Sequence, residues 1–205
     1  MKYKAHDYQQ YATDFIIGHP VSCLILDMGL GKTVITLTAL WLLLFDYFEV
    51  RRILVIAPKR VAETTWPAEI KKWEHLYGMT FAVAMGTAGQ RKEALLSGAD
   101  VTIIGRDNVS WMTKNIFFDF DMVIIDELSS FKSPKAQRFK GLKKVRPMAK
   151  RVVGLTGTPG NLMDLWAEIG ILDMGQRLGR YIGGYRDRFF LCLLYTSPSP
   201  RDKRQ

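Results

Sequence analysis

Cysteine is scarce in this chain, and long apolar runs are missing from it. The 205 residues contain two cysteines, Cys23 and Cys192, which form no Cys-x-x-Cys pair. This usage argues against a zinc site or a disulfide framework and fits a reducing cytoplasm. The most hydrophobic run, 34–45, is too short to span a bilayer, and the start, 1–15, is too polar for a signal peptide. We therefore expect a cytoplasmic protein with no membrane partner.

Acidic residues are missing from one long stretch. The chain has 29 basic and 20 acidic residues, a net charge of +9, and an excess of this size favours a polyanionic partner or an anionic ligand. No Asp or Glu occurs between Leu128 and Met163. Charge alone leaves two interpretations open, a nucleic-acid surface or a solvated helix face. The basic residues of this window are Lys132, Lys135, Arg138, Lys140, Lys143, Lys144, Arg146, Lys150 and Arg151.

Short Val/Ile/Leu runs alternate with helical patterns along the chain. This order predicts an α/β fold, a parallel sheet with helices on both faces, and the length suits a single domain. Pro67 interrupts one helical pattern and is expected either in a first turn or at a break in the helix. The predicted strands are 21–26, 51–57, 81–85, 101–104, 120–126 and 151–156, and the predicted helices include 33–45, 61–76 and 91–96.

The C-terminal segment breaks this pattern. Residues 192–205 contain Ser-Pro-Ser-Pro followed by charged residues, a composition typical of disorder. Residues 192–202 also resemble the translation of a sequencing-library adaptor, although a genuine Pro/Ser linker is the alternative. We therefore expect one domain over 1–191, a non-native disordered tail over 192–205, and a truncated natural sequence.

The stretch Asp27–Thr33, Asp-Met-Gly-Leu-Gly-Lys-Thr, lies where a strand is expected to meet a helix. Backbone N–H groups in such a loop bind phosphate oxygens, and the helix N-terminus adds positive charge. The pattern is that of a Walker A phosphate loop, with Leu26 in place of its first glycine. Lys32 is expected to neutralise phosphate charge, and Thr33 to bind Mg²⁺. The expected phosphate cradle is Met28, Gly29, Leu30 and Gly31; a Gly-rich turn without a ligand is the alternative.

Two adjacent acids end the predicted strand 120–126. Asp126 is placed to hold Mg²⁺, as in a Walker B motif, and Glu127 to orient or deprotonate the water that attacks a γ-phosphate. The second acid favours hydrolysis over transfer to an organic acceptor. Thr156, Gly157 and Thr158 follow the next strand, at the same edge of the predicted sheet, and their hydroxyls are candidates for coupling phosphate state to movement.

These three motifs, in this order, resemble motifs I, II and III of the superfamily-two helicases. The likeness covers about residues 5–190 and is strongest to the Swi/Snf-type branch, in the short forms carried by bacteriophages and prophages; motif II departs from the pattern because Asp-Glu-Leu-Ser replaces Asp-Glu-Ala-His. The resemblance implies a single RecA-like P-loop NTPase domain that uses ATP and Mg²⁺, in a bacterial host cell. It also implies that the sequence carries the first lobe and that the second RecA-like lobe, with its motif VI arginines, is missing.

The resemblance also assigns roles residue by residue. Gln9 matches the glutamine that reads adenine, and Thr156 and Thr158 match the coupling motif. Lys59 and Arg60 match a motif that touches one DNA strand, and Asn108 lies near the next nucleic-acid motif. The implied partner is double-stranded DNA, bound through its backbone without sequence specificity.

The implied function is a DNA-dependent ATPase that moves along duplex DNA. As a fragment, the chain is expected to bind ATP and Mg²⁺ but to turn over poorly. Two alternatives stay open: a non-catalytic nucleotide-binding module that acts through protein contacts, and the motor part of a restriction-modification system.

Overall fold

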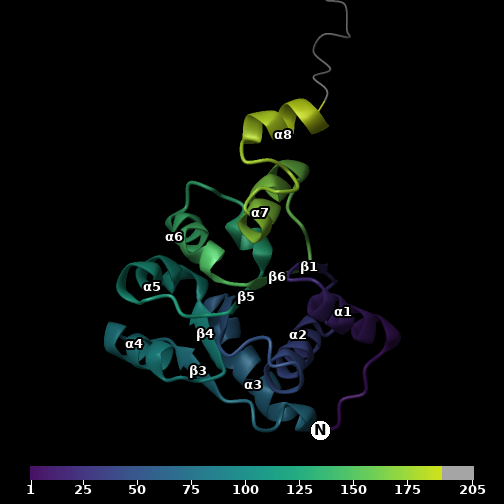
Figure 1. Ribbon diagram of the computed structural model, residues 1–205, viewed down its shortest axis with the longest axis vertical. Helices are drawn as coiled ribbons and strands as arrows, with labels where there is room; N and C mark the ends of the chain where they lie inside the picture. The colour runs from purple at the N-terminus through teal and green to yellow at the C-terminus, as the bar shows by residue number, and fades with distance from the viewer. Residues whose placement is uncertain (191–205) are drawn as a thin grey trace, which may run out of the picture.

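Six parallel strands form the centre of the computed structural model, which describes residues 1–190 (Figure 1). The prediction of a disordered tail over 192–205 lies outside the described residues. The strand order is β1–β6–β5–β2–β4–β3, and every recorded pairing is parallel. The strands are β1 (Val21–Ile25), β2 (Ile53–Ala57), β3 (Phe81–Ala84), β4 (Val101–Gly105), β5 (Met122–Asp126) and β6 (Arg151–Thr156).

Helices cover both faces of this sheet, as the alternation of apolar runs predicted. One buried cluster packs α1, α2 and α3 against the sheet, and a second packs α4, α5, α6 and α7 against the opposite face. Figure 1 shows α1 and α2 well separated from α5 and α6. The helices are α1 (Asp7–Gly18), α2 (Lys32–Trp41), α3 (Trp66–Lys72), α4 (Ala88–Leu96), α5 (Val109–Asn115), α6 (Gln137–Val145), α7 (Leu162–Asp173) and α8 (Ile182–Phe189).

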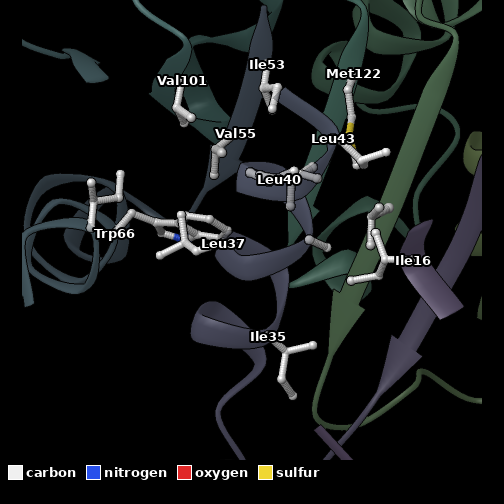
Figure 2. Close-up of a cluster of buried hydrophobic side chains, with 14 of the residues drawn as sticks. Ile16, Ile35, Leu37, Leu40, Leu43, Ile53, Val55, Trp66, Val101 and Met122 are labelled. Atoms are coloured by element: carbon white, nitrogen blue, oxygen red, sulfur yellow. The ribbon is translucent and has the colours of Figure 1, made fainter. Parts of the chain in front are cut away.

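Alternation along the central strand β2 divides the core into two halves. Ile53 and Val55 belong to the cluster under α1, α2 and α3, whereas Leu54 and Ile56 belong to the opposite one. Successive side chains of a strand point to opposite faces, so a continuous apolar run is what a strand buried on both faces requires. Figure 2 shows the first cluster, where the Trp66 ring lies among aliphatic side chains.

The predicted elements agree with the observed ones to within a few residues. The apolar run 34–45 forms α2 and then a π-helical turn, Leu42–Asp46. Pro67 lies in the first turn of α3, which directly continues the π-helical turn Val61–Thr65. Within residues 1–190, none of the helices combines the length and the apolar composition needed to cross a bilayer.

The carboxyl ends of the parallel strands lie along one edge of the sheet. In strand order, this edge carries the loop after β1 with Lys32, the turn after β6 with Thr156, and Asp126 at the end of β5. The segments after β2 and β4 continue the row. In open α/β sheets this is the edge where ligands bind.

Candidate functional site

The loop between β1 and α2 turns through two left-handed glycines. Gly29 has φ +83° and Gly31 has φ +80°, and Gly31 is the N-cap of α2. An L side chain rarely adopts these angles, so glycine is required at both positions. A Cβ on Gly29 would meet nothing within 4 Å, which leaves the space above the loop open, whereas a Cβ on Gly31 would lie 2.7 Å from Nε2 of Gln9.

The Lys32 ammonium lies across this loop. Its Nζ donates to the carbonyl oxygen of Leu26 at 2.6 Å and to that of Asp27 at 3.0 Å. A Cβ on Gly157 would lie 3.7 Å from the same Nζ, so the ammonium sits between the loop and the turn after β6. An incoming phosphate would replace backbone carbonyls, which are neutral partners, with a charged one.

Asp126 and Glu127 follow each other but differ in environment. Burial raises the pKa of Asp126, although the Trp66 hydrogen bond, the Glu127 backbone N–H and the Lys32 charge oppose this effect. Glu127 has φ +59°, a left-handed conformation that costs a non-glycine residue about 1–3 kcal/mol. The Ser129 hydroxyl donates to Oε1 of Glu127, so this serine holds the second acid.

Gln9 is 7% exposed and its amide is tied to the phosphate loop. Nε2 donates to the carbonyl oxygen of Leu30 at 3.3 Å, while Oε1 accepts from the His6 backbone N–H at 3.0 Å and from the Tyr3 hydroxyl at 3.3 Å. The Tyr8 hydroxyl also donates to Leu30, at 3.3 Å. One N–H of the Gln9 amide remains available to a ligand.

Two cavities meet at the phosphate loop. The sheet-edge pocket, about 640 Å³, is lined by Asp27, Met28, Gly29, Lys32, Glu127, Gly157 and Thr158. The N-terminal pocket, about 600 Å³, shares Gly29 and Lys32 with it and adds Gln9, Gly31 and Thr33. Each volume is typical of a small-molecule site. The residues of motifs I, II and III line the sheet-edge pocket, and Gln9 lines the N-terminal pocket on the other side of Gly29 and Lys32.

The donor set fits a metal that is shared with a phosphate. Within residues 1–190, no group of three or more His, Cys, Asp or Glu side chains could hold a metal by itself. Mg²⁺ is commonly bound by one or two protein oxygens together with substrate phosphates and water. The candidates for those protein oxygens are Thr33, which lines the N-terminal pocket, and Asp126, which ends β5.

The turn after β6 is closed by its own hydroxyl. Thr156 Oγ1 donates to the carbonyl oxygen of Thr158 at 3.0 Å. Behind this turn lies Glu168 of α7, which is 1% exposed. Its Oε1 is buried beside Gly160 and has no hydrogen-bond partner among residues 1–190. Burial raises the pKa of Glu168. The sequence analysis missed Glu168 because its position on a helix resembles any other helical glutamate.

The expected nucleic-acid residues lie at the same edge, beyond Asp126. Lys59 and Arg60 are exposed after β2, and Asn108 is half-buried at the end of the short 3₁₀ helix Arg106–Asn108, after β4. Strands β2 and β4 are neighbours, so the fold brings the starts of these two segments together.

The basic window divides into core and surface residues. Arg146 and Arg151 are buried, and they donate to the carbonyl oxygens of Leu172 and Ile16 respectively. Arg138 forms a 3.2 Å ion pair with Asp107. The six lysines are exposed. The lysines could therefore form an extended basic surface. Of the nine basic residues, Arg146 and Arg151 instead stabilise the fold from within.

Comparisons with known proteins agree on one family. The family model described as SNF2-related domain matches residues 8–176. Protein p41 of Acyrthosiphon pisum secondary endosymbiont phage 1 is 39% identical over 175 residues, covering 80% of this chain and 38% of p41. The human DNA annealing helicase and endonuclease ZRANB3 is 28% identical over 190 residues, covering 88% of this chain and 17% of ZRANB3.

A solved structure shares the fold. The Sulfolobus solfataricus SWI2/SNF2 ATPase core in complex with dsDNA superposes with a TM-score of 0.79 at 27% identity, covering 92% of this chain and 39% of that one. The chain therefore spans about two fifths of the length of p41 and of this ATPase core.

Proposed function

This chain belongs to the SNF2-related domain family, and we propose that it is the ATP-binding lobe of a DNA-dependent ATPase that moves along duplex DNA without separating the strands. One observation carries the proposal. Lys32, Glu127 and the turn Gly157–Thr158 line one pocket at the edge of a parallel sheet. A cation suited to phosphate, a candidate base and a candidate coupling turn therefore share one pocket, which supports the proposal.

Phosphate binding would use the loop and its lysine. The backbone N–H groups around residues 28–31 and the N-terminus of α2 attract anionic oxygens, and the Lys32 ammonium would move from the carbonyls of Leu26 and Asp27 to the β- and γ-phosphates. Thr33 and Asp126 would hold Mg²⁺, which supplies charge neutralisation when bound.

Hydrolysis would depend on Glu127. Its carboxylate lines the sheet-edge pocket and is held by the Ser129 hydroxyl, so it is placed to orient water and accept its proton. A left-handed backbone at this residue is the kind of local strain that is found at active sites.

Base selection would fall to Gln9. Its amide is anchored to Leu30 and keeps one N–H for adenine, which offers ring nitrogens as acceptors. Because the same amide contacts the phosphate loop, base recognition and loop geometry would be linked.

Duplex DNA would contact the neighbouring part of the edge. Lys59 and Arg60 are exposed cations, and Asn108 can donate to a phosphate oxygen. Such contacts add salt-dependent affinity that does not depend on base sequence. Closure of a second lobe over the nucleotide would then convert hydrolysis into movement. The Sulfolobus ATPase core in complex with dsDNA supports this partner.

Turnover by this chain alone is expected to be low. In the helicase family that this sequence resembles, arginines of a second lobe complete the γ-phosphate site. In related phosphate chemistry, such arginine fingers raise the rate by about 10³–10⁵-fold. A DNA-stimulated rate in this chain equal to that of its two-lobed relatives would contradict this expectation.

The proposal is tested by nucleotide binding and by one substitution. This chain should bind a fluorescent ATP analogue in the presence of Mg²⁺, and Lys32→Ala should abolish that binding. In a longer protein that carries both lobes, Glu127→Gln should lower ATP hydrolysis by about 10²-fold or more while nucleotide binding is retained. If Glu127→Gln left the biological activity intact, the non-catalytic interaction module would be the better description.

A further inference from the structure

A buried tryptophan contacts the acid at the end of β5. The indole N–H of Trp66 donates to Oδ2 of Asp126 at 2.9 Å, and Trp66 is 0% exposed. Trp66 is the first residue of α3, on the segment that follows β2, and β2 pairs with β5. The contact therefore joins two neighbouring strand ends.

The two groups depend on each other chemically. A buried indole N–H needs an acceptor, and a half-buried carboxylate needs donors to offset its lost hydration. A charge-assisted hydrogen bond of this kind is shorter and stronger than a neutral one. The Trp66 indole N–H is the side-chain donor recorded on the Asp126 carboxylate among residues 1–190, so it has a direct influence on the orientation of that carboxylate.

The Trp66 ring cannot easily move without disturbing the core. It belongs to the buried cluster that includes Leu37 and Val55 (Figure 2), and α3 begins a few residues after the exposed Lys59 and Arg60. A displacement of the segment that carries these cations would pull on Trp66 and, through it, on Asp126.

We propose that Trp66 is a positioning residue that holds the Asp126 carboxylate for Mg²⁺ and connects it to the segment that carries Lys59 and Arg60. The inference rests on the proposed function, since it assigns a metal to Asp126. Trp66 lines neither the sheet-edge pocket nor the N-terminal pocket, so it would act through Asp126. A donor that hydrogen-bonds to a metal-ligating carboxylate typically changes metal affinity by about 10–100-fold.

The test is a Mg²⁺ titration of the chain bound to a fluorescent ATP analogue. Trp66→Phe keeps an aromatic ring in the cluster and removes the N–H donor. We expect the Mg²⁺ midpoint to rise about tenfold, with the affinity for the analogue in EDTA unchanged. The matched control is Trp41→Phe. Within residues 1–190 the Trp41 indole N–H is buried with no hydrogen-bond partner, so removing it breaks no hydrogen bond. The Mg²⁺ midpoint of Trp41→Phe should therefore equal that of the wild type.

The outcomes separate the two proposals. If the wild-type chain binds no nucleotide with or without Mg²⁺, the proposed function fails and the role of Trp66 falls with it. If the wild type responds to Mg²⁺ and Trp66→Phe responds at the same midpoint, the positioning role alone is overturned.

A second measurement keeps the inference testable if Trp66→Phe does not fold. The chain has five tryptophans, so five indole N–H signals are expected in a proton–nitrogen NMR spectrum. One of them should move when Mg²⁺ is added to the nucleotide complex, and the same signal should move in Asp126→Ala without metal. An indole spectrum that Mg²⁺ leaves unchanged would overturn the inference.

Discussion

The carboxyl edge of the sheet has two halves that are built in different ways. The half proposed to bind the nucleotide, called the nucleotide half, lies at the ends of β1, β6 and β5. Its loops are shaped by backbone geometry at left-handed Gly29, Gly31 and Glu127. The half proposed to bind DNA, called the nucleic-acid half, lies after β2 and β4 and presents exposed side chains such as Lys59 and Arg60 on short helical segments. One half is a shaped cavity and the other is a charged surface.

This difference separates two kinds of sensitivity. A shaped cavity loses function when one backbone angle or one close contact changes, because neighbouring groups cannot move independently. A charged surface loses affinity gradually, by about the same amount for each cation removed. Substitutions in the two halves should therefore differ in size and in their dependence on salt.

Among the substitutions that compare the two halves, the largest effect is expected at Gly31 in the nucleotide half. Gly31→Ala forces an L side chain to φ +80°, which costs about 1–2 kcal/mol, and places a Cβ 2.7 Å from Nε2 of Gln9. Gln9 must move away from Leu30, so both the loop and the candidate adenine contact are lost. We expect the affinity for a fluorescent ATP analogue to fall by at least about tenfold.

Gly29→Ala is the matched control for Gly31→Ala. Gly29 has a similar angle, φ +83°, but its added Cβ would meet nothing within 4 Å. Gly29→Ala should lose only the part of the affinity for the ATP analogue that depends on the backbone angle. Equal losses in the two variants would show that the contact between Gly31 and Gln9 has no role in binding.

A smaller effect is expected in the nucleic-acid half. The double variant Lys59→Ala, Arg60→Ala should weaken binding to duplex DNA and reduce the slope of log affinity against log salt by about 2. Nucleotide affinity should stay unchanged. The control is Lys92→Ala, Lys114→Ala, which removes two exposed cations on α4 and at the end of α5. If both variants changed the slope equally, DNA binding would be a general effect of net charge.

The nucleotide half could largely be predicted from sequence because its determinants are local. Glycines at 29 and 31, Lys32 and Thr33 are contiguous, and a strand before them with a helix after them fixes how they are used. The neighbouring positions of Lys32 and Glu127 in one pocket followed from the rule that parallel strands end at one edge. The rule applies here because every recorded strand pairing is parallel.

The remaining features depend on long-range contacts, so sequence alone could not give them. Trp66 falls within the predicted helix 61–76, where nothing local marks it as polar, and its hydrogen bond to Asp126 spans 60 residues. In the basic window, Arg151 counted as a surface cation, but it donates to the carbonyl oxygen of Ile16 on α1. Whether a polar group is exposed or buried depends on which element packs over it, and this is decided by the fold.

The smallest expected effect lies behind the nucleotide half, at Glu168. Burial raises its pKa above the usual value of 4.5, with Asp164 and Glu127 raising it further and the Gly160 backbone N–H and Lys132 opposing. A carboxyl whose pKa is higher in the folded state than in the unfolded state binds its proton more tightly when folded. The free energy of unfolding therefore decreases as pH rises from the unfolded pKa through the folded one. Ionisation of Glu168 therefore lowers the free energy of unfolding, and it does so only at the higher pH.

Glu168→Gln removes this ionisation and keeps a side-chain oxygen beside Gly160. The difference in Tm between Glu168→Gln and the wild type should be small near pH 5 and should grow in favour of the variant by pH 8. The control is Glu93→Gln on α4, where the side chain is exposed and the difference should not change with pH. A variant that is less stable than the wild type at pH 8 would mean that ionised Glu168 stabilises the turn after β6, and burial would then not be the dominant influence on this acid.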